Sequence, residues 1–181
     1  MKNSICLCLV FLLSLAASSA QAQNLVANPG FEKTLAGWSM FGVGWRTSSG
    51  QDAHSGNLGI VDDVLPTQGP TDNWRGVYQN IKAIPGETFN ASVWIRTVSV
   101  KASQSYLEVQ FLDSSNAVLF QVDSPVIVAN QPYTQCSLSH LVAPPRADTI
   151  SVRGVVHMPS LPTHDPEFFI FDDFSLTLTS R

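Results

Sequence analysis

The sequence predicts an all-β protein in which two antiparallel sheets pack as a sandwich or jelly roll. Short segments with apolar residues at every second position recur along the chain, and this is the periodicity of half-buried strands. Prolines and glycines, 11 of each, recur throughout, and no window carries apolar residues at helical spacing. Ten alternating segments without an internal repeat favour two packed sheets over a single one.

The predicted strands follow one another with turn residues between them. Pro85-Gly86, residues 113–116 and Pro144-Pro145 combine residue types that favour turns. The loop over residues 65–73 contains two prolines and is expected to take its order from its surroundings. In chain order, the predicted strands cover residues 25–27, 38–45, 57–61, 74–81, 88–98, 105–113, 117–122, 134–142, 149–157 and 167–177.

The N-terminus has the pattern of a removable secretory signal. Lys2 supplies the positive charge, residues 5–17 form an apolar run, and Ala20-Gln21-Ala22 fits the cleavage pattern. The run is too short to span a bilayer. We therefore expect residues 1–22 to be removed, residues 23–181 to form one domain, and the protein to be secreted or periplasmic.

Cysteine usage and charge narrow the function further. Cys6 and Cys8 would leave with the signal, so Cys136 would have no partner for an intramolecular disulfide. The formal net charge of −4 becomes −5 without Lys2. This charge argues against nucleic acid and anionic membranes as partners, because both require clustered positive charge. We expect a monomer without membrane insertion.

Alternation also assigns the faces of three predicted strands. The apolar side chains of each strand should face the core. The outward side chains should be Asn90, Ser92, Trp94 and Arg96 in the first strand, Tyr106, Glu108 and Gln110 in the second, and Ser151, Arg153 and His157 in the third.

These outward side chains would form one surface if the three strands lie in the same sheet. Aromatic rings stack on the CH faces of sugars, while planar amide, carboxylate and guanidinium groups pair with their hydroxyls. The alternative is an ordinary solvated sheet face. The candidate sugar-binding residues on this surface are Trp94, Arg96, Tyr106, Glu108, Gln110, Arg153 and His157.

Motifs at both ends of the predicted domain resemble a known family. Residues 24–32 read Asn-Leu-Val-Ala-Asn-Pro-Gly-Phe-Glu and precede Gly37-Trp38, while residues 171–176 read Phe-Asp-Asp-Phe-Ser-Leu. With the central run 74–96, they resemble carbohydrate-binding modules of the family 4, 9, 16 and 22 type. The resemblance covers residues 24 to about 178. It implies a galactose-binding-like jelly roll that binds polysaccharide of the xylan or β-glucan type in a cleft on its concave sheet.

The resemblance also implies roles for individual residues. Trp74 corresponds to the aromatic of the loop before the Gln-containing strand, and it joins the candidate sugar-binding residues. Arg153 and His157 match a basic pair at the border of the cleft. Trp38 matches a Gly-Trp element that packs inside the fold.

A structural calcium ion is a further implication of the resemblance. Hard oxygen ligands from both ends and a loop suit Ca²⁺, and the ion would fasten ends that no disulfide joins. The ligands implied are Gly30, Glu32, Asp52, a carbonyl near His54, and Asp172.

No catalytic residue is predicted, so we expect a binding protein that is not itself an enzyme. A glycosidase needs two carboxylates in one cleft, and Glu108 is the only acidic residue placed on the predicted surface. The histidines are scattered, and Cys136 has no context of a nucleophile. Two alternatives remain open. One is a surface or matrix interaction protein with this fold. The other is a small polysaccharide hydrolase or lyase, for which a second acidic group, a tyrosine or a histidine near Glu108 would be the sign.

Overall fold

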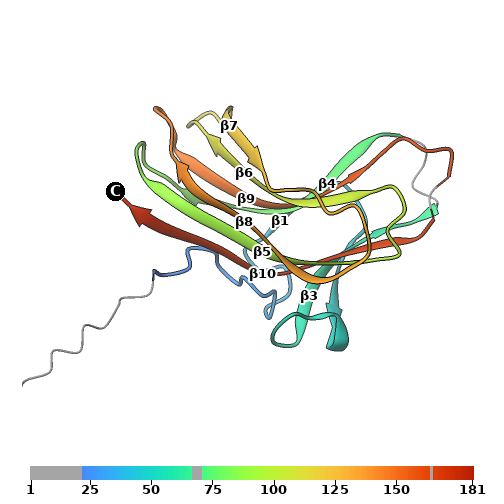
Figure 1. Cartoon of the computed structure of the whole chain (residues 1–181). Helices are drawn as coiled ribbons and strands as arrows, with labels where there is room; N and C mark the ends of the chain where they lie inside the picture. The colour runs from blue at the N-terminus through green and yellow to red at the C-terminus, as the bar shows by residue number, and fades with distance from the viewer. Residues whose placement is uncertain (1–21, 67–70, 164) are drawn as a thin grey trace, which may run out of the picture.

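The computed structural model of the protein describes residues 22–66, 71–163 and 165–181. These residues form ten strands and one short 3-10 helix, Gly50–Asp52, arranged as two packed antiparallel sheets (Figure 1). The predicted signal at 1–22 lies almost entirely outside the described residues. Within the described part, no helix has the length and apolar character needed to cross a membrane. The predicted all-β sandwich is confirmed.

Each sheet contains five strands, and every neighbouring pair is antiparallel. The first sheet has the order β1 (Ser39–Phe41), β4 (Asn73–Lys82), β9 (Thr149–Met158), β6 (Gln104–Leu112) and β7 (Val118–Asp123). The second sheet has the order β2 (Trp45–Ser49), β3 (Leu58–Val64), β10 (Glu167–Ser180), β5 (Thr88–Val98) and β8 (Gln131–Val142).

The core lies between the sheets, where the predicted alternation places it. Val93 and Ile95 of β5, Leu107 and Val109 of β6, and Val152 of β9 are all fully buried. Side chains at every second position interdigitate with those of the opposite sheet, as in other sandwiches. Burial of this kind is the main stabilising contribution to the fold.

The predicted strand at 38–45 is wrong as a single element. Gly42 and Gly44 have φ values of +74° and +99°, so the extended chain ends there and turns. A Cβ at Gly42 would lie 2.4 Å from Cγ of Arg75, which leaves no room for a larger residue. The chain therefore leaves the first sheet after β1 and enters the second sheet at β2.

The predicted strand at 25–27 is also absent, because the segment makes separate contacts with β10 in place of a continuous ladder. Asn24 makes an isolated bridge to Thr177. Its amide nitrogen donates to the carbonyl of Phe174, and its Oδ1 accepts from the backbone N–H of Leu176. The N-terminal segment is thus joined to β10 by Asn24 and by backbone hydrogen bonds that link Leu25 with Leu176 and Pro29 with Phe174.

The following segment closes one end of the core with aromatic rings. Phe31 is fully buried, and its ring lies 4.9 Å from that of Trp38. Trp38 also packs 4.7 Å from Phe174 and donates its indole N–H to the carbonyl of Asn28. The prediction that Trp38 belongs to the core is confirmed.

One buried ion pair bridges the two sheets beneath the turn that contains Gly42 and Gly44. Arg75 of β4 lies 3.2 Å from Asp62 of β3, and their side chains are 1% and 0% exposed. Arg75 Nη1 also donates to the carbonyl of Val43 in the turn. Burial raises the pKa of Asp62 to about 7 despite the charge of Arg75. The pair therefore joins β3, β4 and the turn between β1 and β2.

Candidate functional site

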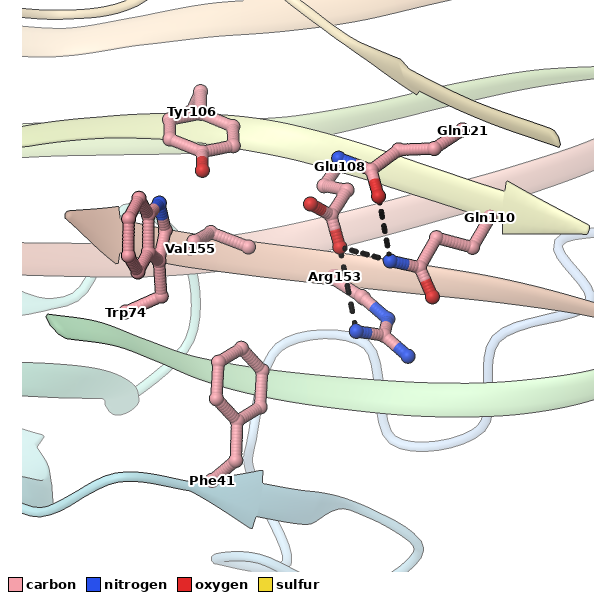
Figure 2. Close-up of a pocket in the computed structure, with 8 residues that line it drawn as sticks. All are labelled: Phe41, Trp74, Tyr106, Glu108, Gln110, Gln121, Arg153 and Val155. Atoms are coloured by element: carbon pink, nitrogen blue, oxygen red, sulfur yellow. Dashed lines mark hydrogen bonds and ion pairs between the residues drawn. The ribbon is translucent and has the colours of Figure 1, made fainter. Parts of the chain in front are cut away.

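A pocket of about 340 Å³ opens on the face of the first sheet that is turned away from the core (Figure 2). Strands β1, β4, β6, β7 and β9 all contribute side chains to it. The lining residues are Phe41, Trp74, Tyr106, Glu108, Gln110, Gln121, Arg153 and Val155. This volume lies within the range of ordinary ligand sites.

Three aromatic side chains surround Val155 at one end of the pocket (Figure 2). Trp74 is the most accessible of them, with 51% of its surface exposed. Its ring stacks on that of His157, with centroids 4.4 Å apart and an interplanar angle of 11°. Gln104 and Asp72 each lie 2.8 Å from a ring nitrogen of His157. His157 thus supports Trp74 and does not itself line the pocket.

Phe41 reaches the pocket because its neighbour in the sheet is a glycine. The register pairs Phe41 of β1 with Gly76 of β4. A Cβ on Gly76 would lie 2.2 Å from the Phe41 ring, so any side chain there would displace the ring. Gly76 therefore allows Phe41 to lie over β4 beside Val155.

Polar side chains form the other half of the pocket. The register pairs Glu108 of β6 with Arg153 of β9, and Arg153 Nη1 lies 3.3 Å from Glu108 Oε1. Gln110 donates to the same oxygen at 3.0 Å and to Gln121 Oε1 at 2.9 Å. Arg153 also donates to Ser151 and lies over the rings of Phe41 and Tyr78. These groups are held in place by one another before any ligand arrives.

Burial shifts the pKa values of two side chains that line the pocket, Glu108 and Tyr106. It raises the pKa of Glu108, Arg153 opposes the shift, and the charge of Asp123 adds to it. Asp123 is the register partner of Glu108 on β7. Burial also raises the pKa of Tyr106 to about 12, so its hydroxyl stays protonated. The pocket therefore offers a hydroxyl, carboxamides, a guanidinium and a carboxylate beside the exposed ring of Trp74.

The structure brings most of the predicted residues together. Trp74, Tyr106, Glu108, Gln110 and Arg153 line one pocket, and their role in binding stays a prediction. The alternation placed the side chains of Tyr106, Glu108, Gln110 and Arg153 on the correct faces of their strands, and the resemblance supplied Trp74.

The grouping of Trp94 and Arg96 with these residues is wrong. They lie on β5, which belongs to the second sheet between β10 and β8. Trp94 stacks on His54 at 4.2 Å, and Arg96 pairs with Asp52 at 3.1 Å. Alternation assigns a residue to one face of a strand, but it does not say which sheet the strand joins.

Phe41, Gln121 and Val155 were not predicted as site residues. Phe41 and Gln121 come from β1 and β7, the edge strands of the first sheet. Val155 lies opposite Tyr106 in the register of β9 with β6. The alternation of β9 puts Val155 on the same face as Arg153, but its apolar side chain gave no sign of a site. Only the strand order and register could have placed Phe41 and Gln121 in the pocket.

The residues implied for calcium meet where the two ends of the chain approach the loop at 53–58. Asp172 Oδ2 accepts from the backbone N–H groups of His54 and Ser55 at 2.7 and 3.2 Å. Glu32 Oε1 accepts from those of Asn57 and Leu58 at 2.8 and 2.9 Å. Both carboxylates therefore fasten the loop through amide groups.

The oxygen atoms at this site meet part of what a Ca²⁺ ion requires. A Cβ on Gly30 would lie 3.4 Å from Asp172 Oδ1, so the Gly30 backbone and this buried carboxylate are neighbours. Asp172 and Glu32 supply hard oxygens, as Ca²⁺ prefers. Within the described residues, no group of three or more His, Cys, Asp or Glu side chains could hold a metal ion. Backbone carbonyls would have to supply most of the remaining ligands.

Asp52 does not point toward these carboxylates. Its side chain pairs with Arg96, and its carbonyl accepts from Tyr133 Oη at 2.5 Å. The His54 ring is held by Asp173 at 2.7 Å and stacks on Trp94. Arg96 and Tyr133 thus engage Oδ1 and the carbonyl of Asp52, and its role as a calcium ligand stays a prediction.

Comparison with solved structures finds proteins of similar fold. No protein-family model matches the sequence, and no curated protein matches it either. A family 61 carbohydrate-binding module in complex with β-1,4-galactotriose has a TM-score of 0.63 at 15% identity, over 87% of this chain and 100% of that chain.

Two larger proteins contain a similar domain. One comprises the family 22 carbohydrate-binding module and glycoside hydrolase module of a Clostridium thermocellum xylanase, complexed with xylohexaose. Its TM-score is 0.62 at 19% identity, over 89% of this chain and 29% of that chain. The other is the enzymatically active domain of a bacteriophage tailspike protein, with a TM-score of 0.63 at 16% identity, over 86% of this chain and 21% of that chain. At these identities the likeness concerns the fold, and the chain has the jelly-roll β-sandwich fold that is found in carbohydrate-binding modules.

Proposed function

We propose that this protein binds a polysaccharide chain of the xylan or β-glucan type in the pocket beside Trp74. The observation that carries the proposal is the exposed Trp74 ring next to a network of fixed polar groups, Glu108, Gln110 and Arg153. The ring offers a stacking surface for the apolar face of a sugar, and the network offers partners for its hydroxyls. The structural neighbours that bind galactotriose and xylohexaose support the same ligand class.

We propose further that binding is the whole activity and that the protein acts outside the cytoplasm. Glu108 Oε1 is occupied by Arg153 and Gln110, so the carboxylate is held as part of a fixed network. The predicted N-terminal signal supports export. Such a protein would hold a chain near a separate enzyme, or anchor it at a surface.

A glycoside hydrolase is the second candidate, because one observation favours it. Asp123 stands opposite Glu108 in the sheet and adds to the rise in the pKa of Glu108. A carboxyl with a raised pKa beside a second carboxylate is the arrangement that glycosidases use. The two candidates differ in whether the polysaccharide is cut.

One experiment separates the two candidates and tests the first. Native gels cast with xylan, mixed-linkage β-glucan or galactan are run against a gel without polysaccharide, and the same polymers are incubated with the protein and assayed for reducing ends. We expect retarded migration on at least one of these gels and no release of reducing ends. Release of reducing ends that Glu108→Gln abolishes would establish the hydrolase. Unretarded migration on every gel would contradict the proposed binding.

We propose also that calcium binds through the Gly30 carbonyl, Glu32, Asp172 and carbonyls of the adjacent loop. An ion that binds only the folded state at 100 times its Kd stabilises it by about 2.7 kcal/mol. In a domain of this size, that corresponds to roughly 5–10 °C in Tm. We expect a chelator to lower Tm by this amount and added Ca²⁺ to restore it.

Glu32→Gln is the matched variant for the calcium site, because it keeps the size of the side chain and removes its charge. Its Tm should be low from the outset and should respond little to the chelator. A wild-type Tm that the chelator leaves unchanged would show that the amide contacts alone fasten the loop.

A further inference from the structure

We propose that the pocket selects its polysaccharide by charge, taking neutral or amino-bearing chains and rejecting chains with carboxylate or sulfate groups, with Glu108 and Asp123 as the selecting residues. The inference rests on the proposed function, since it concerns which sugar chain the same pocket binds. It follows from the charges around the pocket and from which of them are already engaged.

The one cationic side chain among the residues that line the pocket already has a carboxylate partner there. Arg153 Nη1 pairs with Glu108, and its Nε donates to Ser151 at 3.0 Å. Its guanidinium carbon lies 5.8 and 5.2 Å from the ring centroids of Phe41 and Tyr78. An incoming carboxylate would therefore compete with Glu108 for a guanidinium whose charge is already balanced.

His157 does not face a ligand in the pocket. Its two ring nitrogens are engaged, Nδ1 with the Gln104 amide and Nε2 with Asp72, each at 2.8 Å. The ring lies behind Trp74 in the stack, and its carboxylate partner Asp72 lies on the same side.

Carboxylates outnumber cations around the pocket. Glu108 lies in its floor with 8% of its side chain exposed, Asp123 stands beside Glu108, and Asp72 lies at the end where His157 supports Trp74. Coulomb interactions are stronger at buried positions than in water because the effective dielectric constant is lower. An anionic sugar placed over Glu108 would therefore be repelled.

Glu108 also presents an open acceptor to a ligand. Among the described residues, its hydrogen bonds all go to Oε1, and Oε2 turns toward the aromatic end of the pocket (Figure 2). A hydroxyl or an ammonium group can donate to this oxygen. The nearby rings of Trp74 and Tyr106 favour a cation further through their π faces.

The test uses oligosaccharides whose sugars share the β-1,4 linkage and the configuration of glucose but differ in charge. These are cello-oligosaccharides, fully deacetylated chitosan oligosaccharides and oligosaccharides of β-1,4-glucuronan. Binding is measured by calorimetric titration at a pH at which the amino groups are protonated and the carboxylates are ionised. We expect the glucuronan to bind at least about tenfold more weakly than the neutral chain and the chitosan to bind more tightly, with both differences shrinking as salt is added.

Two variants assign the effect to the selecting residues. Asp123→Asn removes a charge without touching the pair between Arg153 and Glu108, and Glu108→Gln removes the charge inside the pocket. Each should lower the ratio of the glucuronan Kd to the cello-oligosaccharide Kd. Glucuronan binding as tight as the neutral chain, or a ratio that neither variant changes, would overturn charge selection while leaving the proposed function intact. Failure of all three chains to bind, together with unretarded migration on every polysaccharide gel, would contradict the proposed function itself.

Discussion

Replacing Asp62 by leucine is expected to lower the free energy of unfolding by about 3–5 kcal/mol, because it leaves the buried guanidinium of Arg75 without its ion-pair partner. Arginine cannot shed its charge to relieve this penalty. Domains are stable by only about 5–15 kcal/mol, so the loss is a large fraction of the total. Urea unfolding at mildly alkaline pH, where Asp62 is ionised in the wild type, measures it directly.

A double variant separates the loss of charge balance from simple damage to packing. When Arg75→Met accompanies Asp62→Leu, both charges are gone and the space is filled by apolar side chains. Replacing a whole buried pair in this way is often neutral or stabilising, so most of the lost stability should return. If the double variant is as unstable as Asp62→Leu alone, the loss is caused by packing and not by charge. Space beneath the turn is tight, since a Cβ on Gly44 would lie only 2.6 Å from Asp62 Oδ1.

Trp74→Ala should weaken binding of the polysaccharide by about 30-fold or more and leave the fold intact. A stacked aromatic at the centre of a site commonly contributes about 2 kcal/mol or more, which is the free-energy equivalent of this change. Half of the Trp74 surface is already exposed, so its removal costs little core packing. Affinity electrophoresis on the gel that retards the wild type measures the loss, and thermal unfolding checks the fold.

Trp94→Ala is the matched control, because Trp94 is also a tryptophan on the outer face of a sheet, but that sheet is the second one. Its ring stacks on His54, so the variant can lose some stability while its migration on the polysaccharide gel stays that of the wild type. Retardation that Trp94→Ala abolishes and Trp74→Ala preserves would move the binding site to the other sheet.

The sequence was sufficient to predict the strands whose alternation is regular. The prediction for 88–98 coincides with β5, that for β9 ends one residue early, and that for β6 begins and ends one residue late. Such strands have one apolar face, and a shift by one residue would expose it, so pattern and structure must agree. Trp38 was also recognisable as a core residue from its motif.

Two features of the fold depend on tertiary contacts and could not be predicted from alternation: the turn between β1 and β2, and the sheet to which β5 belongs. Gly42 lies against Arg75 and Gly44 against Asp62, and both are partners from distant strands. The turn that splits the predicted strand 38–45 is therefore fixed by residues that are 18 to 33 positions away. The assignment of β5 to the second sheet has the same origin, since it depends on pairing with β10 and β8.

The candidate site was predictable for residues on the central strands and not for those at the edges. Tyr106, Glu108 and Arg153 face outward from β6 and β9, which pair directly with each other. Phe41 and Gln121 enter through the register of the edge strands β1 and β7. A sequence pattern contains no information on register between strands so far apart in the chain.

The central claim is that the sugar chain binds in the pocket beside Trp74. The most direct test is to titrate the protein with an oligosaccharide that it binds and to monitor the indole N–H signals by NMR. The chain has four tryptophans, and single Trp→Phe variants assign their signals. Binding in the pocket beside Trp74 predicts a large, saturable shift of the Trp74 signal, while those of Trp38 in the core and Trp94 on the second sheet stay in place. A saturable shift of Trp94 with an unchanged Trp74 signal would contradict the account.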